Sequence, residues 1–136
     1  MRKWVAVMLV LAPSLAWAQT PPVQVATKVM QNAAVATGNG SAIDVSSANI
    51  LVMQVTISAT ATVTYEASLD NTNWTALPCA ALGGTSQAST ISASGMVRCN
   101  VTGISLVRAR ISSYGSGTVT VTGVANLAPN SWGVAN

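Results

Sequence analysis

The chain of 136 residues carries only three Asp or Glu and six Lys or Arg side chains, and it contains no histidine. A chain of this length has room for one domain, which can bury roughly two-thirds of its unfolded surface in a single core. Without histidine there is no ordinary Ser-His or Cys-His nucleophile pair. The apolar half is mostly Val and Ala, and Thr, Ser and Gly fill much of the remainder, which favours short strands over helices.

Residues 1–18 follow the three-part pattern of a secretory signal peptide. Arg2 and Lys3 precede an apolar run that is too short to span a bilayer, and Ala16 and Ala18 form an A-x-A cleavage pattern before Gln19. We expect cleavage there, and no stable membrane insertion afterwards. An uncleaved anchor is the alternative. The mature chain would keep four cationic and three acidic side chains, for a net charge near +1.

Residues 19–40 are predicted to be an N-terminal arm or linker. They begin with TPP and continue through NAAVATGNG, and they contain one candidate strand within VQVATKVM at 23–30. The β-domain is expected over residues 41–125. Residues 126–136 would form a C-terminal tail in which Trp132 packs on the domain or on a neighbour.

Apolar and polar residues alternate between Ala59 and Leu69. The odd positions are apolar and all even positions from Thr60 to Asp70 carry Thr, Glu, Ser or Asp, which predicts a half-buried strand with its odd face inward. Residues 51–57 alternate in the same way, although Ile50 and Val52 make the start of that strand apolar on both faces. Further strands are predicted in SAIDVSS (41–47), WTALPC (74–79), STISA (89–93), MVRCNV (96–101), SLVRARIS (105–112) and GTVTVTGVA (117–125).

These seven or eight short strands are separated by turn signals and by no helical segment. The sequence therefore predicts an all-β fold, an antiparallel β-sandwich or jelly roll.

Cys79 and Cys99 are the two cysteines of the chain. In an exported protein such a pair is most simply a disulfide. Closing a loop of this length would stabilise the fold by about 3 kcal/mol in the chain-entropy description. In a cytoplasmic protein the same residues would be small buried hydrophobes. Two cysteines without histidine do not make a zinc site, and no cofactor is expected.

The carboxylates offer little for catalysis. Glu66 and Asp70 are four residues apart on one strand face, which is about 13 Å of extended chain. Glycoside hydrolysis uses carboxylates roughly 5 to 9.5 Å apart. Asp44 can approach either of them only through the tertiary fold. We expect no catalytic residues and no enzymatic activity.

The segment Asp70-Asn71-Thr72-Asn73 opens like a calcium loop. The Gly at the sixth position and the Glu at the twelfth are missing, however, and Ala81 occupies the latter. We therefore expect no metal, and interpret Asp70, Asn71 and Asn73 as a turn whose side chains bond the local backbone. Trp74 would anchor the next strand.

Arg98, Arg108 and Arg110 form the remaining candidate site. Arg108 and Arg110 are two apart and so point to the same side of a strand. Too few cations and no interleaved aromatic residues accompany them for nucleic-acid binding. We expect cross-strand pairing with carboxylates, or a place in a protein interface, where Arg is enriched.

Four sequence elements carry a resemblance to a known group of proteins. VTYEASLDNTNWTAL and GMVRCNVTGISLVRARISSYGSGTVTVTG resemble small β-rich structural proteins of tailed bacteriophages and prophages, over roughly residues 41–124. Those proteins share an S-x-D-G-x-N-W turn, a V-x-G element, a V-R-x-R strand and a Y-x-S-G-T-x-x-V hairpin. The matching residues are Ser68, Asp70, Asn73 and Trp74; Val101 and Gly103; Val107, Arg108 and Arg110; and Tyr114, Ser116, Gly117 and Thr118.

The chain departs from that pattern in two places. Asn71 stands where the turn usually has Gly, a replacement that Asn makes because it tolerates a left-handed conformation. The signal-like segment is also unusual, since a virion component assembles in the cytoplasm.

The resemblance implies a non-enzymatic virion component, such as a capsid decoration, a fibre or an accessory protein. It would act through contacts with protein partners or with copies of itself, in the virion. The first and third elements are also similar to discoidin-like domains. That similarity implies the alternative, a secreted or periplasmic module that recognises glycan or a cell surface.

Overall fold

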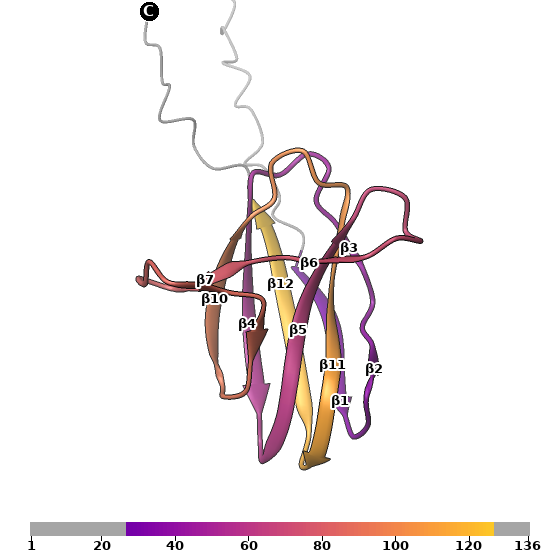
Figure 1. Cartoon of the computed structure of the whole chain (residues 1–136), viewed down its shortest axis with the longest axis vertical. Coiled ribbons are helices and arrows are strands. Elements are labelled where there is room, and N and C mark those ends of the chain that lie inside the picture. The colour runs from indigo at the N-terminus through magenta and orange to yellow at the C-terminus, as the bar shows by residue number, and fades with distance from the viewer. Residues whose placement is uncertain (1–26, 127–136) are drawn as a thin grey trace, which may run out of the picture.

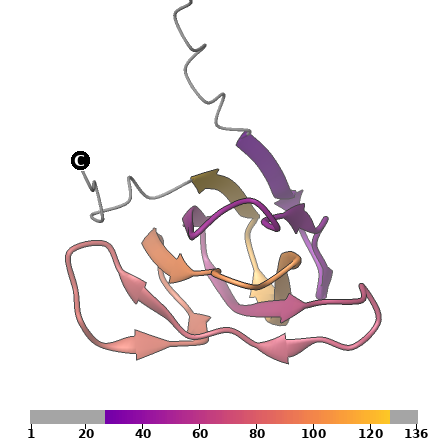
Figure 2. The ribbon, with the colours of Figure 1, turned by 90° about the horizontal axis from the view of Figure 1, so that it is seen from above.

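The computed structural model describes residues 27–126, so the predicted signal segment at 1–18 and the tail with Trp132 lie outside the described residues. The described chain forms twelve strands in two sheets, and all its strand pairs are antiparallel. Figures 1 and 2 show the two layers. The predicted all-β, two-sheet architecture is confirmed. Within these residues there is no helix of the length and apolarity needed to cross a membrane.

The first sheet, called sheet A, has six strands. Their order is β1 (Thr27–Ala34), β12 (Val119–Asn126), β4 (Ile50–Ile57), β10 (Gly95–Asn100), β7 (Cys79–Ala81) and β8 (Gln87–Ala88).

The second sheet, called sheet B, is built on two long strands. Its order is β2 (Gly38–Asn39), β11 (Leu106–Ser116), β5 (Thr60–Ser68) and β6 (Thr75–Ala76); β3 (Ile43–Asp44) also pairs with β11, and β9 (Thr90–Ile91) with β5.

The core lies between the sheets and is made largely of β-branched and aliphatic side chains. Alternation places one side of each long strand inward, as in Leu51, Met53 and Val55 of β4. Val107, Ala109 and Ile111 of β11 face them from sheet B and are also buried. This single core is what the length and apolar content predict.

Four very short strands raise the strand count above the predicted seven or eight. Residues Thr75–Ile91, called the strap, carry β6, β7, β8 and β9. The strap passes from β5 of sheet B to β10 of sheet A and returns to β5. In Figure 1 its first half, from β6 to β7, runs across the direction of the long strands. The predicted strands in WTALPC and STISA thus occur as parts of a crossing segment.

The sheet begins earlier than the predicted boundary at Ser41. Residues 27–34 pair with β12 and residues 38–39 pair with β11, so this part of the expected arm belongs to the sandwich. Two backbone hydrogen bonds fix the connection: the Ser41 N–H donates to the Met30 carbonyl at 2.8 Å and the Gly40 N–H to the Ala109 carbonyl at 3.1 Å. Small residues that read as a linker therefore form a close crossing between the sheets.

Candidate functional site

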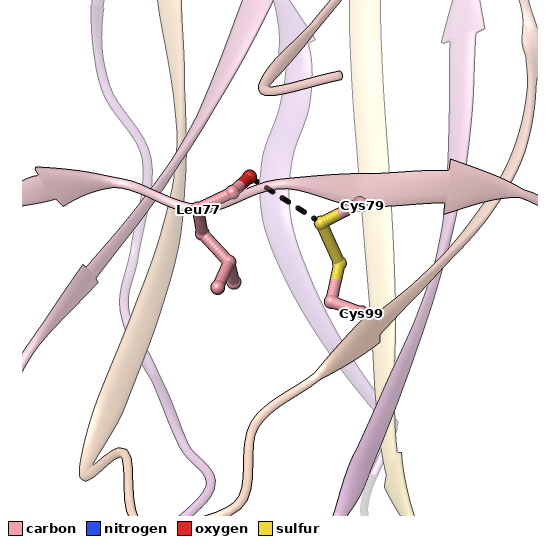
Figure 3. The surroundings of a disulfide bond; sticks show 3 residues. All are labelled: Leu77, Cys79 and Cys99. Carbon is pink, nitrogen blue, oxygen red and sulfur yellow. Dashed lines mark hydrogen bonds between the residues drawn. A yellow bond between two sulfur atoms is a disulfide. The ribbon is translucent and has the colours of Figure 1, made fainter. Parts of the chain in front are cut away.

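The disulfide joins the strap to sheet A. Cys79 of β7 and Cys99 of β10 are bonded, with their Cα atoms 4.4 Å apart. Continuing the β7 to β10 register from Val97–Ala81 and Arg98–Ala80 places these two residues directly opposite each other. Both are buried. Figure 3 shows that the Leu77 carbonyl oxygen also approaches Cys79 Sγ, at 3.6 Å, although a bonded sulfur has no hydrogen to donate.

The Asp70 carboxylate organises the turn after β5. Its Oδ1 accepts hydrogen bonds from the backbone N–H groups of Asn73 at 2.8 Å and Thr72 at 2.9 Å, and its Oδ2 accepts from Asn73 Nδ2 at 2.7 Å. These donors favour the charged form and lower the pKa of Asp70 well below its usual 3.8. Asn71 has a φ of 61°, in the left-handed region. The structure thus places Asp70, Asn71 and Asn73 in one tight turn.

Asp44 has a similar local role near β3. Its Oδ1 accepts from the Ser46 hydroxyl at 2.6 Å and from the Ser46 N–H at 2.9 Å. These two hydrogen bonds lower the pKa of Asp44. The carboxylate therefore closes a turn.

Glu66 is the third carboxylate and lies on the outer face of sheet B. It accepts from Arg108 Nε at 2.7 Å through Oε2 and from Arg110 Nε at 2.9 Å through Oε1. The cross-strand register pairs Arg108 directly with Glu66, and Arg110 lies two residues along β11. The expected pairing of arginines with a carboxylate is present, and one carboxylate serves two arginines.

Trp74 covers this ion pair. Its ring centroid lies 4.1 Å from Arg108 Cζ, which is a cation–π arrangement. The side chains of Arg108 and Glu66 are only 16% and 11% exposed, whereas that of Arg110 is 39% exposed. We call Glu66, Trp74, Arg108 and Arg110 the arginine cluster. With one negative and two positive groups it carries a net charge of +1.

Arg98 is not part of the cluster. It is exposed on β10, where it lies opposite Val52 of β4 in sheet A. The structure therefore brings together two of the three arginines singled out in the sequence and places the third on the other sheet.

A pocket of about 460 Å³ lies beside the Asp70 turn. Its wall combines the end of β5 and the turn with the loop before β11, through Ala67, Ser68, Leu69, Asp70, Asn73, Thr75, Gly103 and Ile104. Leu69 is 71% exposed at this site. We call it the loop pocket.

Tyr65 is a buried titratable residue next to Glu66. It is 1% exposed, and within residues 27–126 its hydroxyl makes no hydrogen bond to the protein. Burial raises the pKa of Tyr65, because the charged phenolate is poorly solvated there. The Tyr65 side chain packs in the hydrophobic core between the sheets.

All three side-chain carboxylates, which lie within the described residues, are thus engaged in structural contacts. Asp44 and Asp70 hold turns, and Glu66 holds two arginines. Among the described residues no group of three or more His, Cys, Asp or Glu side chains could bind a metal ion. Sequence reasoning missed the partnership of Trp74 with Arg108. The sequence marks Trp74 and Arg108 only as members of two separate matched motifs, and nothing in it indicates that the two side chains are in contact.

The fold defines the class, a small β-sandwich protein of two antiparallel sheets. The sequence model of the XepA family matches residues 24–125, and the chain belongs to that family. No curated protein sequence matches the chain significantly.

Two solved structures share the fold. The SPBc2 prophage-derived protein YomS superposes with a TM-score of 0.69 at 19% identity, over 74% of this chain and 91% of YomS. The PBSX exported protein XepA superposes with a TM-score of 0.73 at 16% identity, over 92% of this chain. The chain spans about half of XepA, 47% of its length. At these identities the likeness describes the fold.

Proposed function

We propose that this chain is a non-enzymatic structural protein of a phage particle, a capsid decoration, fibre or accessory component that acts through protein–protein contacts. One observation carries the proposal: every side-chain carboxylate is committed to a turn or to the arginine cluster. An acid–base pair needs carboxylates free to exchange protons with a substrate. The commitment of these carboxylates to structural contacts supports a structural role for the sandwich.

The comparisons support a prophage setting for this role. One structural neighbour is described as prophage-derived and the other as an exported protein of PBSX. The signal-like segment of this chain instead favours the alternative location, outside the cytoplasm. The proposed location is the virion, and a secreted or periplasmic location is the alternative.

Mass spectrometry of purified particles tests this proposal. The prophage is induced, particles are banded on a density gradient, and peptides of this chain are quantified against a known capsid protein. We expect the chain at a fixed ratio to that protein across the particle band. A chain found only in the unbanded supernatant contradicts the proposal.

The loop pocket favours a second candidate, a discoidin-like binding module. Its wall pairs exposed Leu69 with the polar groups of Asp70, Asn73 and Thr75 at one end of the sandwich, where binding loops of such domains gather. A glycan array separates the candidates. Saturable binding that Leu69→Ser abolishes and Leu82→Ser leaves intact supports the module, because Leu82 is similarly exposed on the strap.

A further inference from the structure

We propose that the arginine cluster is a docking site for a carboxylate-rich segment of another protein. The inference rests on the proposed function and names the chemistry of the partner. It begins from a charge imbalance: Glu66 neutralises one of the two guanidinium groups, so the outer face of sheet B keeps one positive charge at a fixed place. A partner carboxylate would bring the cluster to neutrality.

The donors of the cluster are only partly used. Arg108 and Arg110 each give their Nε hydrogen to Glu66, and among the described residues neither gives an Nη hydrogen bond to the protein. Each guanidinium has five N–H donors in a rigid fork that fits a carboxylate. The Nη groups are therefore available to an incoming oxygen pair.

The cluster is also preorganised. Glu66 fixes both Nε atoms, and the Trp74 ring lies over Arg108 and restricts its rotamers. Fixing these side chains in the free protein reduces the entropy that binding must otherwise overcome. Trp and Arg together are the side chains most enriched among energetically dominant interface residues. This composition favours a protein segment over other acidic polymers.

A second copy of this chain has no carboxylate-rich segment, because Asp44, Glu66 and Asp70 are its only Asp or Glu residues. Each of the three already accepts hydrogen bonds from its own chain: Asp44 from Ser46, Asp70 from the turn that follows it, and Glu66 from the arginines of the cluster. The partner is therefore a different protein with exposed Asp or Glu residues.

Arg98 provides a matched control. It is exposed on sheet A, away from Glu66, and its loss changes the net charge of the chain by the same amount as the loss of Arg110. The probe is a dye-labelled peptide of about ten glutamates, compared with the same length of glutamine, in fluorescence anisotropy titrations of the full mature chain. Binding of the glutamate peptide should weaken as salt rises.

We expect Arg110→Ala to weaken binding of the glutamate peptide at least about tenfold, Arg98→Ala less than about twofold, and Arg110→Lys by an intermediate factor, because Lys keeps the charge without the fork. Circular dichroism and thermal melting check that each variant is folded. Equal losses in Arg98→Ala and Arg110→Ala would indicate general charge attraction and overturn the proposal. Equal binding of the glutamine peptide, or no binding of either, overturns it too.

Two further arms separate the remaining outcomes. In the first, polygalacturonate is titrated in place of the peptide. If it binds more tightly than the peptide and this binding depends on Arg110, the partner is an acidic polysaccharide and the proposed protein partner is wrong. In induced particles, Arg110→Ala should lower incorporation of the chain and Arg98→Ala should not. If wild-type chain is absent from particles, the proposed function fails while the peptide result still stands. If Arg110→Ala incorporates normally, only the docking site fails.

Discussion

Trp74 lies over Arg108, with 4.1 Å between Arg108 Cζ and the centroid of the ring. The same arginine donates its Nε hydrogen to Glu66 at 2.7 Å. Because Trp74 directly follows the Asp70 turn, this one contact holds the turn and the start of the strap against sheet B. The loop pocket and the arginine cluster are therefore parts of one packed unit.

Replacing Glu66 tests how far the cluster supports the fold. Glu66→Gln keeps the shape and a hydrogen-bond acceptor but leaves two neighbouring guanidinium groups without a counter-charge. We expect a loss of about 1 to 3 kcal/mol in the free energy of unfolding, measured by urea denaturation. Arg98→Ala should change it by less than about 0.5 kcal/mol, since Arg98 is exposed. An unchanged midpoint in Glu66→Gln would show that the ion pair adds nothing to stability.

Asp70 should make stability fall in acid. Its pKa is lower in the folded chain than the ordinary 3.8, because of hydrogen bonds from the Asn73 and Thr72 N–H groups. A lowered folded pKa contributes stability that is fully present above 3.8 and is lost as pH falls below that value toward the folded pKa. Asp70→Asn removes this contribution.

Thermal melting at neutral pH and at about pH 2.5 measures the effect. Asp70→Asn should melt below the wild type at neutral pH, and the gap should narrow in acid. Asp44→Asn is the comparison, because the pKa of Asp44 is lowered for the same kind of reason and its loss acts in the same pH window. A gap for Asp70→Asn that is constant with pH contradicts the assignment.

The two-sheet architecture could be predicted because alternation is a local property of the sequence. The odd positions of β5 are buried from Ala61 to Tyr65, as the pattern indicates. The pattern then fails at Glu66, which is buried although its position predicts exposure. Its burial depends on partners 42 and 44 residues away, whose register with β5 no local pattern specifies.

The strands of the sandwich begin before the predicted domain start at Ser41 for a related reason. Small residues and glycine between Ala33 and Gly40 read as a linker, since Val35 is the only apolar side chain larger than Ala there. What holds this segment is backbone hydrogen bonding to both sheets, which leaves no compositional trace. The sequence indicated the arginine cluster only through Arg108 and Arg110, two arginines on one side of a strand. It did not place Glu66 or Trp74 beside them.

Loss of the disulfide should destabilise the sandwich through the strap. Cys79 and Cys99 are 20 residues apart, and closing a loop of that length contributes about 3 kcal/mol in the chain-entropy description. Cys79→Ala with Cys99→Ala should lower the free energy of unfolding by about that amount. Dithiothreitol should lower it in the wild type and leave the double variant unchanged. A wild type equally stable with and without reductant would contradict this.

Asn71 should accept glycine and reject β-branched residues. At a φ of 61° the backbone is in the left-handed region, where an ordinary side chain meets the following carbonyl oxygen. Asn71→Val should cost about 1 to 2 kcal/mol, whereas Asn71→Gly should be neutral or slightly stabilising. Chemical denaturation of the two variants measures the difference in their free energies of unfolding. A Val variant as stable as the Gly variant would show that the turn relaxes to another conformation.

Gly40 is predicted to be the glycine least tolerant of a methyl group near the start of the sandwich. A Cβ there would lie 2.5 Å from the Ala109 carbonyl oxygen of sheet B and 2.6 Å from the Met30 carbonyl oxygen of sheet A. Both obstacles are backbone atoms, so neither can rotate away as a side chain would. The chain crosses between the two sheets at this point, and the N–H of Gly40 itself bonds the Ala109 carbonyl.

Gly40→Ala should therefore lower the free energy of unfolding by about 1 to 3 kcal/mol, as overpacking does in a well-filled core. Gly38→Ala is the matched control, because a Cβ at Gly38 meets nothing within 4 Å. The two variants differ from the wild type by the same single methyl group and lie two residues apart. Equal stability of the two in urea denaturation would mean that the crossing is looser than the 2.5 and 2.6 Å approaches require. The expected difference would place the close contact of the two sheets at Gly40, inside the segment that the sequence alone assigns to a linker.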